Sequence, residues 1–487
     1  MKREAWVKEA INEMVGCGAI GRVRYGQSNM TMPSDGRYQP SDLRPYLGYD
    51  QWASWLIIVE WAWLKTLAKK AVIPVAEASL LRPKLLSKML QSITTTDQDS
   101  EEAKTKHDII ALTNLMKLHL PLPLHKWLHY CATSYDIICT AYALQYQVTF
   151  EQVLLPKMLE LDQLWCKLIE DHAEVLQAGR THLQTALPIT VGFWLAQLHN
   201  RYVRNCRTSM LFADLVEGKF SGAVGTYASQ VVMLKDSGLE KNLMQTLGLN
   251  TAPISTQISP PESMQEAYHS LMLLSGSLAN LGEDVRILQS SAYQELISTS
   301  STSSAMSHKT ANPIAAEQLL GMHRTVISEY MLIAMNMVSD LQRDLSNSSC
   351  MRRYSSIMVY VYQQLLTAER LLKSLKVNIE RCQKNLGLES HYLTAEILHL
   401  SMGLAGLPAA HEFVNEKIIG MVQSSGCSLA DAMDIFCENS VDNNSKAVGA
   451  AWGKVPEEVK SILYQPELYI GKAKELAKLE AKNYILR

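Results

Sequence analysis

Several short stretches of the 487-residue chain gather side chains that can transfer protons or hold anions. One of them, residues 298–317, starts with a run of serine and threonine and continues through His308 and Lys309 to Asn312 and Pro313. Because Asn is a good N-cap and Pro a good first helical residue, the stretch predicts a polar loop ending at a helix N-terminus. The free N–H groups and the dipole of such a terminus attract anions. Composition alone favours the alternative of a plain flexible linker.

Other reactive stretches interrupt apolar sequence further along the chain. They are T-K-H-D at 105–108, H-Y-C-A-T-S-Y-D at 129–136, G-R-T-H-L-Q-T-A-L-P at 179–188, F-S-G-A-V-G-T-Y-A at 220–228, S-T-Q at 255–257 and R-D-L-S-N-S-S-C-M-R-R at 343–353. Each is weak evidence by itself, since a histidine becomes a catalyst only where a partner and a cleft tune it. Their significance depends on whether the fold brings them together.

The elements that must position these stretches are long helices. Proline is missing from four long intervals, 157–187, 189–252, 262–312 and 314–407. Within them apolar residues recur at helical spacing, as in Leu198, Tyr202, Cys206 and Met210, and in Ile357, Val361, Leu365, Ala368, Leu372, Leu375 and Ile379. Alternating strand patterns are essentially absent, so the sequence predicts an all-α fold with a long central bundle. We expect an N-terminal helical domain at 1–131, the bundle at 132–378 with the loop 298–313, and a small helical domain at 379–487.

The composition of the chain indicates which partners, compartment and cofactors to expect. The chain is 47% hydrophobic and 19% charged with a net charge of -2, so no nucleic-acid or membrane partner is expected. Nine scattered cysteines without a C-x-x-C pair indicate free thiols in a reducing cytoplasm and argue against a structural zinc site. The charged first residues show no secretory signal, and no segment has the ~20 apolar residues of a membrane span. No metal or organic cofactor is expected.

Taken together and in this order, the stretches resemble the fumarase/aspartase superfamily of lyases, and within it the adenylosuccinate branch. S-S-A-M-S-H-K-T-A-N-P is similar to the superfamily signature G-S-S-x-M-P-x-K-x-N-P. The other stretches, with Arg37 and Tyr38 near the start, match the branch in type and order. The resemblance spans roughly residues 36–475. It implies a three-domain, all-α fold that assembles as a homotetramer with active sites shared between subunits.

The resemblance also implies a reaction, the β-elimination of fumarate from a small nucleotide substrate that carries a succinyl group. Adenylosuccinate would give AMP, and the succinylated aminoimidazole carboxamide ribotide would react in the same way. A base must remove a weakly acidic proton beside a carboxylate, and an acid must protonate the leaving nitrogen. By position, Ser303 is the base, supported by Lys309, and His182 is the acid, oriented by Glu317.

The remaining expected site residues bind the substrate. Those expected at the succinyl carboxylates are Lys309 and Asn312, helped by Thr133, Ser134 and Gln257. His107, with its neighbour Asp108, is expected at a carboxylate or the phosphate, and Thr181 is expected to bind the substrate. Those expected at the phosphate are Arg343, Ser348 and Arg352, with Arg37 and Tyr38, because phosphate recognition needs forked cations and hydroxyls.

Some positions depart from the family pattern. They are Thr302 and Ser307 in place of the signature's glycine and proline, Thr310 and Ala311 where the signature has one residue, Cys131 in place of a glycine, and Pro261-Glu262 in place of an arginine-aspartate pair. Two alternatives therefore stay open. One is a superfamily lyase acting on a different acid, of aspartase-like, carboxymuconate or specialised-metabolism type. The other is a weakened, non-catalytic paralogue.

Overall fold

The computed structural model describes residues 2–19, 38–236, 238–298, 312–343, 346–388, 390–439 and 443–486. The chain folds into two compact units. Unit 1 contains Met1–Glu160, Arg204–Ala279 and Gln318–Ala368, and unit 2 contains Leu161–Val203, Asn280–Glu317 and Glu369–Arg487. Because their segments interleave, the units do not correspond to three consecutive ranges, and the division at 131 and 378 stays a prediction.

Five long helices place residues in both units: α9 (Leu155–Asp171), α10 (Val191–Asp214), α12 (Glu262–Leu288), α13 (Ile314–Met335) and α15 (Ser355–Ser374). The elements of unit 1 alone are α1 (Ala5–Ala19), α2 (Arg44–Leu47), α3 (Trp52–Lys69), α4 (Val75–Ala78), α5 (Pro83–Ser92), α6 (Thr95–Thr105), α7 (Asp108–Lys117), α8 (Ser134–Thr149), α11 (Leu239–Leu247), α14 (Ser348–Met351), β3 (Glu217–Gly218) and β4 (Asn250–Thr251).

The elements of unit 2 alone are β1 (Leu176–Thr181), β2 (Gln184–Thr190), β5 (Leu296–Ser298), β6 (Leu375–Val377), α16 (Ile379–Leu388), α17 (Ser390–Leu393), α18 (Ala395–Leu404), α19 (Ala410–Phe413), α20 (Ile419–Ser425), α21 (Leu429–Asn439), α22 (Asn443–Trp452), α23 (Glu457–Tyr464) and α24 (Ala473–Glu480). Short 3-10 or π segments lie at Ser41–Leu43, Tyr49–Gln51, Leu122–Trp127, Phe150–Leu154, Gln230–Leu234, Val414–Ile418 and Pro466–Leu468.

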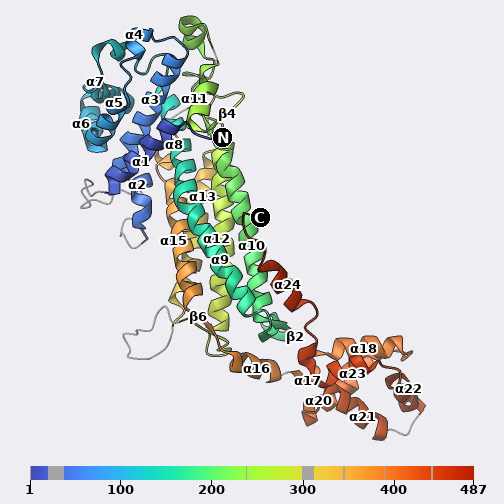
Figure 1. Ribbon diagram of the computed structural model, residues 1–487. Helices are drawn as coiled ribbons and strands as arrows, with labels where there is room; N and C mark the ends of the chain where they lie inside the picture. Colours follow the sequence, from blue (N-terminus) through green and yellow to red (C-terminus); the bar gives the residue numbers. More distant parts are fainter. Residues whose placement is uncertain are drawn as a thin grey trace. The chain divides into compact units, whose positions relative to one another are not determined.

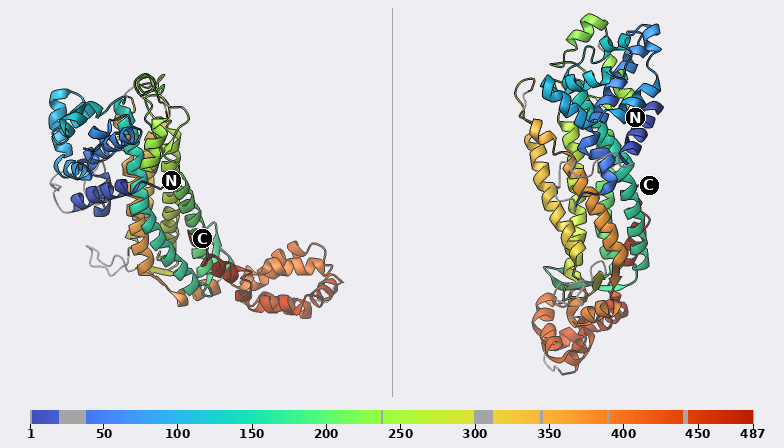
Figure 2. Two further views of the ribbon diagram at one scale, coloured as in Figure 1. Left: turned by 45° about the horizontal axis from the view of Figure 1, so that its top comes forward. Right: turned by 90° about the vertical axis from the view of Figure 1, so that its left-hand side faces the viewer.

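The long helices pack along the predicted apolar stripes. On α10, Leu198, Tyr202 and Cys206 are buried, and on α15 the stripe from Ile357 to Leu372 is buried as well. Within unit 1, Asn205 Nδ2 of α10 donates to the Leu273 carbonyl of α12 at 3.0 Å, and Gln364 Nε2 of α15 donates to the Leu319 carbonyl of α13 at 2.9 Å. Figures 1 and 2 show these helices side by side. The expected bundle helices are therefore present.

The stripe on α15 ends earlier than its spacing predicts. The helix stops at Ser374, and the next three residues form β6, which pairs antiparallel with β5. Ile379, predicted as the last member of the stripe, begins α16 and is exposed. The backbone hydrogen bonds between β5 and β6 take the place of those that another helical turn would form. The spacing of apolar side chains cannot predict this change from helix to strand.

Three short two-stranded sheets accompany the helices, although the sequence showed no strand pattern. In unit 2, β1 and β2 form an antiparallel hairpin whose two-residue turn is His182-Leu183. Both turn residues have positive φ, 55° and 62°, as a type I′ turn requires. The mostly helical fold is thus confirmed, and the G-R-T-H stretch belongs to a hairpin.

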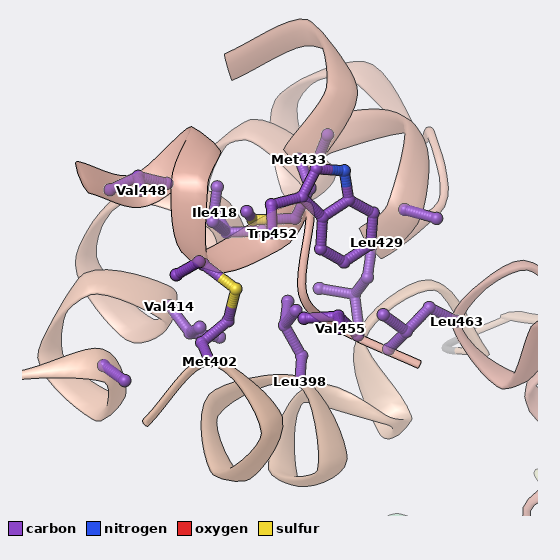
Figure 3. Close-up of a cluster of buried hydrophobic side chains, with 14 of the residues drawn as sticks. Leu398, Met402, Val414, Ile418, Leu429, Met433, Val448, Trp452, Val455 and Leu463 are labelled. Carbon is purple, nitrogen blue, oxygen red and sulfur yellow. The ribbon is translucent and has the colours of Figure 1, made fainter. Parts of the chain in front are cut away.

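The C-terminal helices of unit 2 have a core of their own. Leu398, Met402, Ile418, Met433 and Trp452 face one another in Figure 3, and all are buried. Helices α18 to α23 surround this core, as the orange and red ribbons of Figure 2 show. The cluster lies inside the range predicted for a small C-terminal domain.

Helix α13 begins close to the predicted point. Its first residue is Ile314, whose N–H bonds to the Asn312 carbonyl at 2.8 Å, while the Glu317 N–H bonds to the Pro313 carbonyl at 3.0 Å. The helix therefore starts one residue after the expected Pro313. The serine-rich run before it, with Ser303 and Lys309, lies outside the described residues.

Two further expectations concern thiols and membranes. The cysteines whose side chains the structure describes form no disulfide with one another: 131, 139, 166, 206, 350, 382, 427 and 437. Among the described helices, none combines the length and the apolar composition needed to cross a bilayer.

Candidate active site

A cavity of about 980 Å³ opens in unit 1 and gathers residues from four of the reactive stretches. The predicted site residues that line it are His107, Asp108, Thr133, Ser134, Gln257, Arg343, Ser348 and Arg352. Further lining residues include Tyr49, Trp52, Asp99, Glu102, Lys106, Tyr135 and Tyr142. The volume is at the upper end of the range of about 300–1,000 Å³ typical of small-molecule sites. The fold thus brings together segments far apart in sequence.

The N-terminus of α8 forms one wall of the cavity. Thr133 caps the helix, and its side chain and that of Asp136 form a capping box in which the Thr133 N–H bonds to Asp136 Oδ2 at 2.8 Å. Thr133, Ser134 and Tyr135 line the cavity at this end of the helix. An anion bound here would be stabilised by the helix dipole.

A fully buried ion pair holds this helix terminus. Lys219 Nζ lies 2.5 Å from Asp136 Oδ1, and neither side chain is exposed. The same carboxylate accepts the N–H groups of Ser221 at 3.1 Å and Gly222 at 3.2 Å. Lys219 Nζ also donates to the Gly222 carbonyl at 2.6 Å. The pair therefore joins H-Y-C-A-T-S-Y-D to F-S-G-A-V-G-T-Y-A.

The glycine-rich stretch is in turn locked to S-T-Q. Ser221 Oγ and Ser255 Oγ are 2.6 Å apart. A Cβ on Gly225, whose φ is +79°, would lie 1.9 Å from the Ser255 carbonyl oxygen, so only glycine fits this approach. The contact fixes the backbone two residues before Gln257, which faces the cavity.

Arg343 stands at the junction of S-T-Q, α8 and the arginine-rich stretch. Its guanidinium carbon is 3.4 Å from the centre of the Tyr135 ring, and Nη2 donates to the Tyr135 hydroxyl. The other bonds run to Gln257 Oε1 at 3.3 Å and Asn347 Oδ1 at 3.0 Å. Every described side chain that it bonds is uncharged, so the guanidinium keeps its positive charge for an anion in the cavity.

Arg343 also has a strained backbone, with φ at 142°. Such a conformation persists only where the surroundings over-determine it, and it occurs often at ligand sites. Its neighbour Gln342 is held by a bond from the Gln257 N–H to the Gln342 carbonyl at 3.2 Å. The surroundings therefore fix both the chain and the side chain of this arginine.

A second arginine and a histidine line the cavity together with Arg343. Arg352 Nη1 donates to the carbonyl and the hydroxyl of Ser348 at 2.7 Å and 2.8 Å. His107 Nε2 lies 3.2 Å from Ser134 Oγ, and its Nδ1 lies 3.2 Å from Asp108 Oδ1. T-K-H-D and the start of α8 are thus in direct contact, as a common site requires.

Acidic and aromatic groups line another part of the cavity. The rings of Trp52 and Tyr142 are 4.4 Å apart and tilted by 35°. Tyr49 donates its hydroxyl to Asp99 at 2.9 Å, and burial, followed by this carboxylate, raises the pKa of Tyr49 to about 12. Burial, followed by the charges of Asp108 and Asp99, raises the pKa of Glu102. The cavity thus offers ring faces and hydrogen-bond acceptors as well as cations.

The other predicted site residues fall into three groups. His182, Thr181, Asn312 and Glu317 are exposed and belong to unit 2. Tyr38 belongs to unit 1, half-buried, with its ring 6.2 Å from that of Tyr360. Ser303, Lys309 and Arg37 lie outside the described residues. The roles assigned to all of them stay predictions.

The hairpin that presents His182 is braced by a buried carboxylate. Glu295 pairs with Arg180, Nη2 to Oε1, at 2.5 Å, and accepts bonds from Gln177 and Asn385, each at 2.9 Å. Arg180 also lies over the Tyr293 ring, 4.4 Å from its centre. This bracing holds the tip of the hairpin in a fixed conformation with His182 exposed.

The start of H-Y-C-A-T-S-Y-D is fixed by a second buried carboxylate. His129 Nδ1 lies 2.7 Å from Oε1 of the fully buried Glu60, and the backbone has positive φ at both His129 and Cys131. The φ of 59° at Cys131 lies in the left-handed region that favours glycine. Burial acts to lower the pKa of His129, but the Glu60 carboxylate outweighs burial and raises that pKa.

Sequence reasoning missed the residues that hold the site together. Lys219 directly precedes a quoted stretch, yet a lone lysine beside apolar residues gives no sign of a buried partner. Tyr135 and Asp136 lie inside a quoted stretch but received no role. Trp52 and Tyr142 lie outside the quoted stretches, and only the three-dimensional arrangement shows that they line the cavity.

Comparison with known proteins gives the family. Residues 53–328 match the family model described as "Lyase". An adenylosuccinate lyase of Archaeoglobus fulgidus is 30% identical over 455 residues, which cover 91% of this chain and 96% of the relative. The chain belongs to this family of lyases. It is an enzyme of the family and is similar to adenylosuccinate lyases over most of its length.

Two further relatives bear different names. An N-acetyl-S-(2-succino)cysteine lyase of Dickeya dadantii is 30% identical over 298 residues, covering 60% of this chain and 64% of that protein. The crystal structure of the 3-carboxy-cis,cis-muconate lactonizing enzyme from Pseudomonas putida matches with a TM-score of 0.77 and 19% identity, covering 92% of this chain and 99% of the other. The structural match supports the fold, and the sequence match shows that similar relatives carry different names.

We predict that Lys219→Met lowers the free energy of unfolding by about 3–5 kcal/mol, because Asp136 would be left as an unpaired buried charge. Urea unfolding followed by circular dichroism measures the loss. Lys474→Met, at an exposed pair with Glu174, is the matched control and should cost less than about 1 kcal/mol. Equal, small losses for both variants would contradict the importance of the buried pair.

A second prediction concerns pH. Since the folded pKa of His129 is raised, its bond to Glu60 stabilises the fold fully below the ordinary histidine pKa of about 6.5, and this stability is lost as pH rises through the folded pKa. The unfolding free energy of the wild type relative to His129→Gln should therefore fall as pH rises above about 6.5. His119, whose pKa is lowered by burial, provides a control of opposite sign. A difference for His129 that does not change with pH would rule the interaction out.

Proposed function

We propose that this chain is a fumarate-releasing lyase that cleaves adenylosuccinate to AMP and fumarate. It would cleave the succinylated aminoimidazole carboxamide ribotide in the same way. The observation that carries this proposal is the cavity of unit 1, where Arg343 and Arg352 stand with the hydroxyls of Ser134 and Ser348 in a volume suited to a nucleotide. The resemblance to relatives named adenylosuccinate lyase supports it.

The charge pattern fits such a substrate. Adenylosuccinate carries a phosphate and two carboxylates, and the guanidinium of Arg343, bonded to Tyr135, Gln257 and Asn347, has no charged partner among the described residues. Because the Arg343 guanidinium is already held by hydrogen bonds to uncharged side chains, it loses little conformational entropy on binding phosphate. The Trp52–Tyr142 pair offers ring faces against which a flat base could pack.

The proposed reaction removes a proton and breaks a carbon–nitrogen bond. Ser303, as alkoxide stabilised by Lys309, takes the proton from the carbon beside one carboxylate of the succinyl group. The electron pair passes through an aci-carboxylate, stabilised by hydrogen-bond donors, and then forms the double bond of fumarate. The departing nitrogen keeps the electrons of the broken bond and takes its proton from His182, which Glu317 supports.

The resemblance assigns the other predicted residues to the substrate. Asn312, Thr133, Ser134 and Gln257 are assigned to the carboxylates, Thr181 to the substrate, and His107 with its neighbour Asp108 to a carboxylate or the phosphate. The resemblance to the superfamily supports a homotetramer in which neighbouring subunits complete each site. We place this assembly in the cytoplasm.

One observation favours a second candidate. Where the branch has an arginine-aspartate pair, this chain has Pro261 and Glu262, and α12 begins with Glu262. Burial, followed by the charges of Glu262 and Glu266, raises the pKa of Glu217 beside them. The missing arginine removes a positive charge, so a less anionic succinylated substrate would suit this chain, and the similarity to an N-acetyl-S-(2-succino)cysteine lyase supports a succinyl thioether.

An absorbance assay distinguishes the candidates. The purified protein is expected to change the ultraviolet spectrum of adenylosuccinate as the purine loses its substituent, with fumarate released in equal amount. Ser303→Ala and His182→Gln should each abolish turnover while circular dichroism stays unchanged.

Fumarate release from N-acetyl-S-(2-succino)cysteine without any from adenylosuccinate would favour the second candidate. If the folded protein releases fumarate from neither substrate, the result would favour a non-catalytic paralogue. Near-normal rates in either variant would overturn the roles assigned to Ser303 and His182.

The phosphate assignment has its own prediction. Arg343→Lys keeps the charge but loses the fork, and a bond to a charged group contributes about 1.5–3 kcal/mol, so the KM for adenylosuccinate should rise roughly 10- to 100-fold. Steady-state kinetics measures it. Arg286→Ala, at an exposed pair with Glu283, should leave KM unchanged. An unchanged KM in Arg343→Lys would remove the nucleotide argument.

A further inference from the structure

A second group of reactive side chains lies in unit 2, apart from every stretch used above. Asp162 and Cys166 are four residues apart on α9 and so share one face of the helix, and His199 approaches them from α10. One ligand atom of each lies within 4.8 Å of the others, and all three residues are buried. A buried carboxylate among such groups needs a positive charge beside it. That charge is supplied either by a proton on the histidine or by a metal cation.

One of the two distances from His199 matches that between ligands of a single metal ion, and the other is shorter. His199 Nε2 lies 3.5 Å from Cys166 Sγ and 2.9 Å from Asp162 Oδ1. In a tetrahedral zinc site, bond lengths of about 2.0–2.1 Å to nitrogen and oxygen and 2.3 Å to sulfur put neighbouring N and S atoms about 3.6 Å apart, and N and O about 3.3 Å apart. The N–S separation is already that of a metal site, and the carboxylate would have to withdraw by about 0.4 Å.

The far side of the imidazole ring is held as it is in metal sites. His199 Nδ1 lies 2.8 Å from Oε1 of Glu480, on α24. Glu480 is itself held by Asn200 at 3.0 Å and Asn483 at 3.1 Å. A carboxylate on the second ring nitrogen fixes the tautomer and orients the histidine that binds a metal. It leaves Nε2 directed at Asp162 and Cys166.

We propose that Asp162, Cys166 and His199 bind a divalent transition-metal ion, with zinc the best match, and that Glu480 orients His199. Thiolate and imidazole ligands select zinc over magnesium and calcium, which prefer oxygen alone. A water molecule or the second Asp162 oxygen would complete the coordination. No metal site was expected from the sequence, because the cluster contains a single cysteine and its three residues are spread over two helices.

The site would have a structural role. Asp162 Oδ2 accepts the Ile485 N–H at 3.0 Å, so one ligand already bonds the chain after α24. Glu480 bonds another ligand from α24 itself. Figure 1 shows α24, in dark red, beside α10. A metal here would therefore fasten the C-terminal segment to α9 and α10, and because the ligands are buried it would enter as the chain folds.

A proton is the competing occupant. Burial acts to lower the pKa of His199, but the bonds to Asp162, Cys166 and Glu480 outweigh burial and raise that pKa to about 10. An imidazolium between two carboxylates would hold the same residues without metal. Metal binding must displace that proton and the thiol proton, so it should release protons to solution. The two occupants can therefore be distinguished by direct measurement.

The test uses full-length protein from zinc-supplemented cells, and the same protein unfolded and refolded with Zn²⁺ or Co²⁺. We expect close to one equivalent of zinc per chain by mass spectrometry of the metal, and a thiolate-to-cobalt charge-transfer band in the near ultraviolet. Cys166→Ser should remove the band and His199→Gln should weaken zinc binding strongly. Cys427→Ser, at a half-exposed thiol outside the cluster, should keep both.

Glu480→Gln provides a finer readout, because loss of a partner that orients a ligand costs about 10- to 100-fold in metal affinity. Folded protein that contains no metal by either route would overturn the proposal and leave the proton as occupant. A cobalt band that persists in Cys166→Ser would also overturn it. If Cys166→Ser fails to fold, the metal content of the wild type decides the question.

Discussion

The ion pair between Lys219 and Asp136 is the contact on which the candidate site depends. Two opposite charges with no exposed surface stabilise each other only if their remaining hydrogen-bonding capacity is also satisfied. Asp136 meets this demand with backbone N–H groups from its own helix cap and from Ser221 and Gly222. The requirement of one buried carboxylate therefore dictates the relative positions of two segments more than eighty residues apart in sequence.

From this pair a continuous path of contacts leads to residues that line the cavity. Ser221 bonds to Ser255, two residues later Gln257 bonds to Arg343, and Arg343 lies over Tyr135, the neighbour of Asp136. The path closes on itself, so each member is held from two sides. Such a frame pre-organises a cation whose described partners are neutral, which is what tight recognition of a phosphate requires. The proposed nucleotide chemistry follows from this rigidity as much as from residue type.

The sequence was sufficient to predict the helices and many residues of the cavity, because apolar spacing and the reactive stretches are local signals. It could not predict the ion pair, because a lysine and an aspartate with eighty-two residues between them carry no mark of their pairing. It also missed the β1–β2 hairpin, where Gly179 and Arg180 sit at an irregular register and Pro188 lies in the second strand. The strands there are held by tertiary contacts to Glu295 that no alternation pattern records. The roles of Ser303, Lys309 and His182 still rest on the resemblance alone.

The most direct measurement compares the binding of AMP and adenosine by calorimetric titration of wild-type protein. Both ligands present the same base and sugar, so their difference isolates the phosphate. If the frame holds Arg343 ready for phosphate, AMP should bind roughly 10- to 100-fold more tightly than adenosine, and the gap should shrink in Arg343→Lys. Equal affinities for the two ligands in the wild type would contradict the account.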